Sequence, residues 1–98
     1  MTIKEIRKDL SEIKYYYSRI KEFNYAENTV GKNDIIFKAE KYNNVIKTAS
    51  PIIYDIYIGL YIKNLTQEAL ADELGFSSNY IYKINRKLIR YLQKKLEF

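Results

Sequence analysis

Residues 65–92 read LTQEALADELGFSSNYIYKINRKLIRYL, and the fold is decided by this stretch. Thr66 has a side chain that caps helix N-termini, so we expect a helix over residues 67–74. Gly75 follows the last residue of that helix, where many helices end in a left-handed glycine. Ser77 is the expected N-cap of a second, longer helix. Two capped helices joined by so short a turn are typical of a helix-turn-helix unit.

Apolar residues in this stretch have the spacing that holds two such helices together. Leu65 and Leu70 stand at the N′ and N4 positions of a hydrophobic staple, and Phe76 and Ile81 repeat the spacing. The small core between the helices is expected to contain Leu70, Leu74, Phe76, Ile81 and Ile84. An ordinary helical hairpin is the alternative, because it meets parts of the same pattern.

The longer helix is expected to be strongly amphipathic. At about 100° per residue, its buried side contains Ile81, Ile84, Leu88, Leu92, Lys95 and Leu96. The opposite side contains Asn79, Lys83, Arg86, Lys87, Arg90 and Lys94, with Tyr80 and Tyr82 at its edges. No acidic residue interrupts this side before Glu97.

The charge distribution predicts an anionic partner for this helix. Residues 1–76 hold 11 Lys/Arg and 11 Asp/Glu, whereas residues 77–98 hold six Lys/Arg against Glu97 alone. The net charge of +5 therefore lies on the last helix. Nucleic acid is the simplest partner for a field of one sign on one element. A solvated basic face without a ligand is the alternative.

Geometry divides the candidate DNA contacts into two groups. Asn pairs with adenine and Lys donates to guanine in the major groove, so base-reading side chains are expected at the start of the longer helix, at Ser78, Asn79, Tyr82 and Lys83. Phosphate contacts are expected from Tyr80, Arg86, Lys87, Arg90 and Lys94. Thr66 and Gln67, at the start of the shorter helix, are further candidates for phosphate contacts.

The N-terminal half is expected to contain two helices and a loop. A helix over residues 3–23 is predicted by a seam with heptad spacing, formed by Ile3, Ile6, Leu10, Ile13, Tyr17 and Ile20. This seam packs either on the chain's own core or against a second copy. Residues 24–33 are expected to form a loop, and Asn33 or Asp34 to cap a helix over residues 34–48.

A boundary follows at Ser50 and Pro51, where Ser suits the N-cap and Pro the first helical position. The helix expected over residues 51–63 is apolar almost all round. Such a helix lies either in the core or in an interface.

Composition excludes several classes of protein. The 98 residues contain no Cys and no His, which excludes disulfides, the usual zinc sites, thiol nucleophiles and histidine acid–base catalysis. No paired carboxylates and no glycine-rich phosphate loop are visible, so we expect no enzyme, no metal and no cofactor. No apolar run approaches transmembrane length, and the charged N-terminus does not resemble a signal peptide. We therefore expect a soluble cytoplasmic protein that binds no membrane.

Eleven tyrosines raise the alternative of base stacking on single strands. Tyr17, Tyr42, Tyr57 and Tyr61 occur at helical core spacing, where packing in the core is the simpler account.

The segment from Ser50 to Leu96 resembles region 4 of bacterial sigma factors and the related domains of phage late-gene activators of the RinA and ArpU type. The matching features are an apolar helix before the motif, LTxE at Leu65–Glu68, ELGFS at Glu73–Ser77, and IxxIxxKLIxxL at Ile81–Leu92. The resemblance implies base reading by Ser78, Asn79, Tyr82 and Lys83. The sigma family has Arg, Glu and Arg at the first three of these positions, so the resemblance implies a different target sequence.

The sequence as a whole predicts an all-α domain of four to five helices over residues 1–98. Residues 1–49 form a helical scaffold or oligomerisation part, and residues 50–98 form a helix-turn-helix with a long basic recognition helix. The expected function is sequence-specific binding of double-stranded DNA in transcription regulation, as an oligomer and with RNA polymerase as a second partner. The resemblance implies a phage or mobile element, and hence the bacterial host cytoplasm. Two alternatives stay open: DNA packaging, as by phage small terminase subunits, and a sigma-like module that binds polymerase or a repressor.

Overall fold

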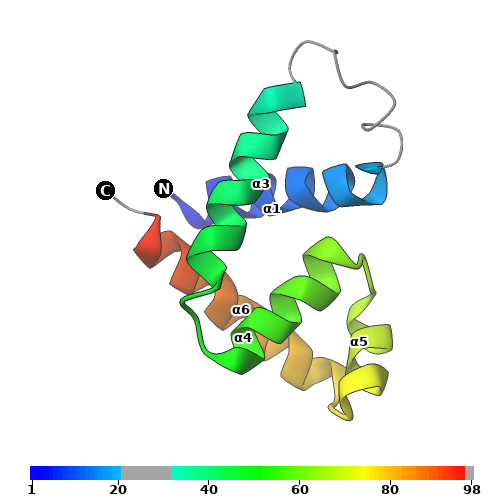
Figure 1. The fold of residues 1–98 in the computed structure, drawn as a ribbon. Helices are drawn as coiled ribbons and strands as arrows, with labels where there is room; N and C mark the ends of the chain where they lie inside the picture. The colour runs from blue at the N-terminus through cyan, green and yellow to red at the C-terminus, as the bar shows by residue number, and fades with distance from the viewer. Residues whose placement is uncertain (21–31, 97–98) are drawn as a thin grey trace.

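The computed structural model describes residues 1–20 and 32–96, and this part of the chain is helical with no strand (Figure 1). In chain order the elements are α1 (Ile3–Ser18), α3 (Lys32–Ile46), α4 (Pro51–Tyr57), the π-helical turn η1 (Ile58–Ile62), α5 (Gln67–Leu74) and α6 (Ser78–Lys95). The expectation of an all-α chain is confirmed for the described residues.

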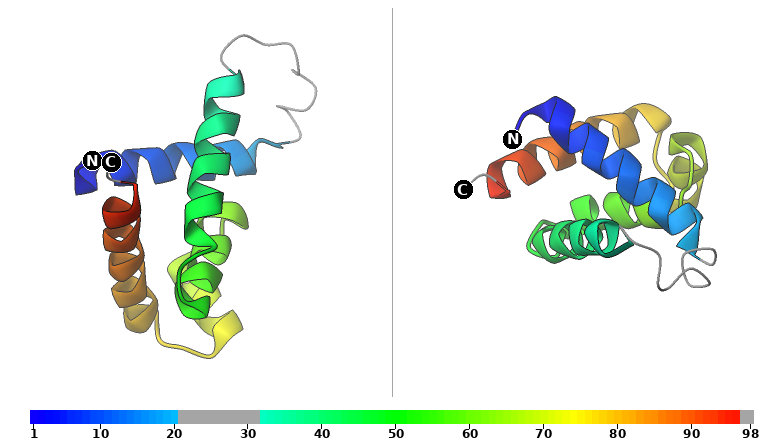
Figure 2. Two further views of the ribbon diagram at one scale, coloured as in Figure 1. Left: turned by 60° about the vertical axis from the view of Figure 1, so that its left-hand side comes forward. Right: turned by 90° about the horizontal axis from the view of Figure 1, so that it is seen from above.

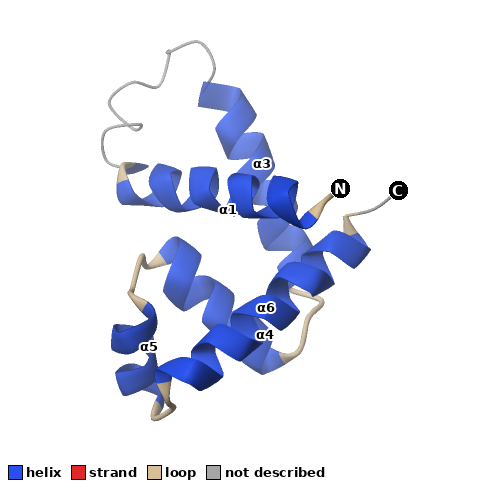
Figure 3. Cartoon of the chain, turned by 180° about the vertical axis from the view of Figure 1, so that it is seen from behind, coloured by secondary structure: helices blue, strands red, loops and turns tan. Residues whose placement is uncertain are grey.

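The helices form two layers. Seen from above, α6 and the start of α1 lie on one side of the molecule and α3 and α4 on the other, and α1 runs diagonally so that its end reaches the side of α3 (Figure 2). Seen from behind, α1 and α6 lie in front of α3 and α4 (Figure 3). Contacts of α1 with α3 and of α4 with α6 join the layers, and α5 packs on α6 and η1. The side-chain amide of Gln93 donates to the carbonyl oxygen of Met1 at 3.1 Å, so the chain's start lies against the C-terminal half of α6.

The seam of α1 packs on the chain's own core. Ile6, Leu10 and Ile13 are at most 1% exposed, although no second copy is present. They share one core with Tyr42, Ile56 and Tyr57 and with the apolar side of α6. Of the two alternatives for this seam, burial within the chain therefore accounts for its central residues.

Local chemistry sets where α1 begins. The Thr2 hydroxyl accepts from the Glu5 N–H at 3.1 Å, and the Glu5 carboxylate accepts from the Thr2 N–H at 2.9 Å, which makes a capping box. The pKa of Glu5 is lowered, first by its hydrogen bond from the Thr2 backbone. Both bonds satisfy N–H groups that the first turn of a helix leaves without partners.

Two predicted boundaries in the N-terminal half are wrong. The helix ends at Ser18 rather than at residue 23, because Arg19 leaves the helical conformation with φ −117° and ψ 14°. The next helix begins at Lys32, so Asn33 and Asp34 lie inside its first turn and do not cap it. An acidic residue is favourable there as well, because the helix dipole stabilises it. Residues 21–31, which include most of the expected loop, lie outside the described residues.

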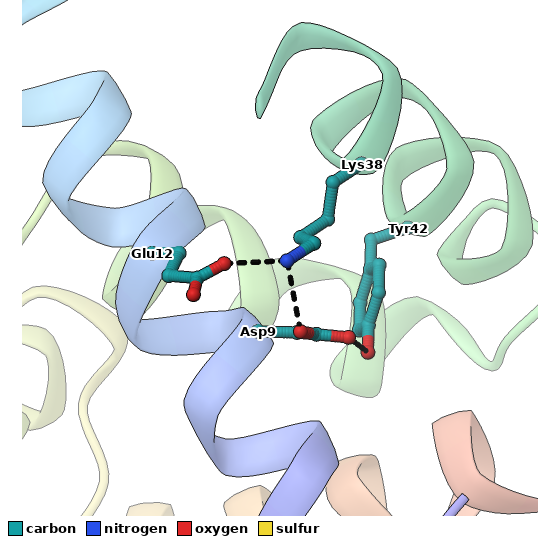
Figure 4. Close-up of polar contacts among 4 residues, drawn as sticks. All are labelled: Asp9, Glu12, Lys38 and Tyr42. Atoms are coloured by element: carbon teal, nitrogen blue, oxygen red, sulfur yellow. Dashed lines mark hydrogen bonds and ion pairs between the residues drawn. The ribbon is translucent and has the colours of Figure 1, made fainter. Parts of the chain in front are cut away.

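Polar contacts join α1 to α3 (Figure 4). The Lys38 ammonium lies 2.5 Å from a Glu12 carboxylate oxygen and 3.1 Å from one of Asp9. The other Asp9 oxygen accepts from the Tyr42 hydroxyl at 2.6 Å. The pKa of Lys38 is raised, chiefly by the hydrogen bond to Glu12. These bonds fix the position of α3 on one side of α1.

A second group of polar contacts ties α4 to the same pair of helices. The Tyr57 hydroxyl donates to the side-chain oxygen of Asn43 at 2.6 Å, and the Asn43 amide donates to the Tyr17 hydroxyl at 2.8 Å. No buried side-chain polar atom of the described residues lacks a hydrogen-bond partner. Of the tyrosines at core spacing, Tyr42 and Tyr57 are buried and Tyr17 and Tyr61 are half-buried, and all four have bonded hydroxyls, which is how tyrosine is used inside proteins.

The helix after Ser50 changes type along its length. Ser50 stands at the N-cap and Pro51 opens the helix, as predicted, but the Ser50 side chain makes no capping hydrogen bond. The α-helix ends at Tyr57 and continues as η1, a change of type that the prediction of one helix over residues 51–63 lacks. Asn64 then reverses the chain with φ 60°, a left-handed conformation that Asn tolerates. Its side-chain amide donates to the Lys14 carbonyl oxygen at 3.2 Å.

Gly59 lets α5 approach η1 closely. A Cβ atom at this position would lie 2.5 and 2.8 Å from the two methyl carbons of Leu70, a side chain that is 2% exposed. The carbonyl oxygen of Gly59 also accepts from the Leu65 N–H at 3.0 Å. The position of α5 therefore depends on the missing side chain.

We predict that Gly59→Ala destabilises the protein by about 1–3 kcal/mol, the usual cost of overpacking. An alanine in a helix interior with free space would instead stabilise by about 0.5–1 kcal/mol, so the sign of the change tests the contact. Urea unfolding followed by circular dichroism measures it. In a Leu70→Ala background the same substitution is expected to lose its cost. An equal cost in both backgrounds would contradict the clash with Leu70.

We also predict that stability falls as the pH rises above 10. Burial raises the pKa of the Tyr42 and Tyr57 hydroxyls well above the ordinary 10.0. The folded state thus holds these protons more tightly than the unfolded chain, so their contribution is complete below pH 10 and is lost above it. Urea midpoints between pH 8 and 11 measure the decline.

Tyr42→Phe is expected to make this decline shallower, because it removes one titrating hydroxyl. It also costs about 1–2 kcal/mol at neutral pH through the lost bond to Asp9. Tyr15→Phe, at a side chain that is 58% exposed, is the matched control. An unchanged alkaline slope in Tyr42→Phe would rule out this residue as a source of the decline.

Candidate nucleic-acid interface

The connection between α5 and α6 is held by the residues that local chemistry predicts. The Thr66 hydroxyl accepts from the Ala69 N–H at 3.1 Å, and the Ser77 hydroxyl from the Tyr80 N–H at 3.1 Å. Gly75 adopts φ 76° after the last residue of α5. The N–H groups of Gly75 and Phe76 both donate to the Ala71 carbonyl oxygen, which closes the helix end. This turn fixes where α6 begins.

The buried side of α6 is wider than predicted. It contains Ile81, Ile84, Leu88, Ile89, Leu92 and Leu96, each at most 5% exposed. Ile89 is not among the predicted buried residues. The prediction includes only residues that lie close to the direction of Ile81 around the helix axis, and Ile89 lies about 80° away from it. A wider arc is buried because α1, α3, α4 and α5 all pack on α6.

Two predicted core residues are exposed instead. Lys95 is exposed, and its ammonium lies 5.7 Å from the centre of the Tyr91 ring. An unpaired ammonium costs too much to bury, so it stays in water at the helix end. Phe76 is 42% exposed, and its ring lies 4.7 Å from that of Tyr80. Of the other residues of the predicted small core, Leu70, Ile81 and Ile84 are buried and Leu74 is half-buried.

The outward side of α6 carries five exposed cations, which we call the basic strip: Lys83, Arg86, Lys87, Arg90 and Lys94. Among the residues that the structure describes, no carboxylate lies within ion-pair distance of any of them. Within the described residues no ion pair compensates their charges, which add up to one field of positive sign.

The first two turns of α6 contain the four predicted base-reading side chains. Asn79, Tyr82 and Lys83 are exposed, and Tyr82 is 47% accessible. Ser78 is half-buried and so less accessible than the other three. No acidic residue lies in the first turn, where the helix dipole already favours an anion.

The remaining predicted contacts are Tyr80, in the first turn of α6, and Thr66 and Gln67, at the start of α5. Tyr80 is 38% exposed beside Phe76. Thr66 is exposed and Gln67 half-buried at the start of α5. The Thr66 hydroxyl oxygen is engaged as a helix cap. Phe76 is exposed beside Tyr80, although the sequence predicts it in the core. Its hydrophobic-staple spacing suggests burial.

Two polar residues that position α6 were not predicted. The Tyr61 hydroxyl of η1 donates to the side-chain oxygen of Asn85 at 2.6 Å, and Gln93 bonds Met1. Around the axis of α6, Asn85 lies among the apolar residues. A polar side chain in such a position needs a hydrogen-bond partner within the protein, and this is a signal that the sequence contains. The identity of that partner is a long-range contact that no local pattern reveals.

No group of three or more metal-ligating side chains occurs in the described part of the chain. A pocket of about 460 Å³ lies between α1 and α3, lined by residues that include Glu12, Tyr16 and Lys38. It contains none of the predicted site residues. Within residues 1–20 and 32–96, no helix combines the length and the apolar character needed to cross a membrane.

The chain matches no family model, and no curated protein or solved structure is similar enough to be assigned as a relative.

Proposed function

We propose that this chain binds double-stranded DNA sequence-specifically and regulates transcription. In this proposal α5 and α6 act as a helix-turn-helix, and α6 is the recognition helix that enters the major groove. One observation carries the proposal: α6 begins directly after a turn capped by Gly75 and Ser77, and one of its sides presents five exposed cations that pair with no carboxylate of the described residues. The resemblance of residues 50–96 to sigma region 4 supports it.

The two ends of α6 have different roles in this proposal. Asn79, Tyr82 and Lys83 read base edges, with Ser78 at the margin of the contact. Tyr80 and the basic strip bind phosphates as the helix leaves the groove, and Thr66 and Gln67 add contacts from α5. A single helix reads only a few base pairs, so we expect the chain to bind as an oligomer and to act beside RNA polymerase.

The basic strip is expected to give DNA binding a steep salt dependence. If α6 neutralises four phosphates, log K falls against log salt with a slope of about −3 to −4. Arg86→Gln with Arg90→Gln removes two contacts and is expected to make this slope shallower by about 2. Fluorescence anisotropy with a labelled duplex pool of random sequence, between 50 and 200 mM salt, measures it. Absence of binding at low salt would refute the proposal.

Asn79 is expected to determine base preference rather than overall affinity. Selection from a random duplex pool, followed by sequencing, should give the wild type a defined site. Asn79→Ala is expected to lose preference at one position, which corresponds to about 1–3 kcal/mol. Lys94→Gln, at the far end of the strip, is the control and should keep the preference while weakening binding. An unchanged site for Asn79→Ala would exclude base reading by this residue.

A further inference from the structure

We infer that α1 carries a second row of phosphate contacts, formed by Lys4, Arg7 and Lys14. The inference rests on the proposed function of α6 and extends the DNA interface to a helix that carries no motif. It follows from the way α1 distributes its charges around its axis.

The charges of α1 are separated by face. At about 100° per residue, an arc of about 80° contains Lys4, Arg7, Ser11 and Lys14, which we call the outer row. All four are exposed. An arc on the opposite side, about 60° wide, contains the acidic residues Glu5, Asp9 and Glu12. The helix is close to neutral along the chain, but this face carries three cations and no carboxylate.

The carboxylates on the other face are engaged within the protein. Asp9 and Glu12 hold Lys38 of α3, and Glu5 caps the start of α1. Among the described residues, none of the cations of the outer row has a carboxylate within ion-pair distance. Their field is therefore free to act on a ligand.

The outer row and the basic strip both point away from the helices of the opposite side. Helix α6 and the N-terminal half of α1 lie on one side of the molecule, and α3 and α4 lie on the other (Figures 2 and 3). Because Asp9 and Glu12 point to α3, the outer row points away from it, to the outside of the layer. The basic strip likewise lies opposite the side of α6 that packs on α4.

Helix α1 runs from the end of α6 to the connection that precedes α5. Its start is bonded to Gln93 near the end of α6, and its carbonyl at Lys14 accepts from Asn64, two residues before Thr66. Packed helices have axes about 8–10 Å apart, and the major groove is about 12 Å wide. When the start of α6 occupies the groove, we therefore expect the outer row to meet phosphates on the side where α6 leaves it.

The test compares two double variants that remove the same charge from different layers. The first variant, Lys4→Gln with Lys14→Gln, changes the outer row. The second, Lys41→Gln with Lys47→Gln, changes two exposed lysines in and just after α3. Each double variant lowers the net charge from +5 to +3. Salt titrations of anisotropy with the random duplex pool give the slope for each. We expect the α1 variant to bind with a slope shallower by about 2 and the α3 variant to keep the wild-type slope. Arg7→Gln alone should make it shallower by about 1.

Equal slopes for the two double variants would overturn the inference. If both stay at the wild-type value, α1 does not touch DNA, and if both become equally shallow, only the total charge matters. Arg86→Gln with Arg90→Gln, measured in parallel, separates this failure from that of the proposed function. An effect of the α6 variant without an effect of the α1 variant refutes the second row alone. Circular dichroism confirms that every variant is folded.

Discussion

Burial of one side of α6 is the constraint on which the described structure depends. Helices α1, α3, α4 and α5 all pack against this one helix. Each fully buried Leu or Ile contributes about 1.5–3 kcal/mol, and α6 supplies five such residues, with its C-cap Leu96 as a sixth. A helix so covered on one side has only its other side to offer to solvent. In this chain that remaining side is where the cations lie.

Polar contacts complete what apolar burial leaves undefined. Apolar contacts are less directional than hydrogen bonds and ion pairs. The position of α3 along α1 is therefore defined more closely by the polar contacts between the two helices. Asp9 supplies two of them, to Lys38 and to Tyr42, at the place where the layers meet. Burial raises the pKa of the Tyr42 hydroxyl, so this group stays neutral. It still donates a directional hydrogen bond to Asp9, and the contact therefore needs no buried charge at Tyr42. The acidic side of α1 is thereby used for folding, and its basic side is left unused by the fold.

Local features were predictable from the sequence, and long-range ones were not. Thr66, Gly75 and Ser77 act through atoms within a few residues of themselves, so their roles follow from type and spacing alone. The extent of the buried side of α6 depends on how many helices cover it, and this is why Ile89 was missed and Lys95 misplaced. The staple spacing of Phe76 does not distinguish a buried ring from one stacked on Tyr80. The bond from Tyr61 to Asn85 spans 24 residues and is set by the fold as a whole.

Counting charges along the chain conceals how they are arranged in space. The sequence places the whole excess of +5 after residue 76, because the 11 cations before it are balanced by 11 carboxylates. That balance describes the total charge but not the field near a surface, which depends on the nearest charges within about 8–10 Å at ordinary salt. On α1 the carboxylates are drawn toward α3 by Lys38, so the outer row acts without them. A segment that is neutral by count can therefore extend a basic surface that another helix begins, and this is why we propose that one DNA duplex contacts both helices.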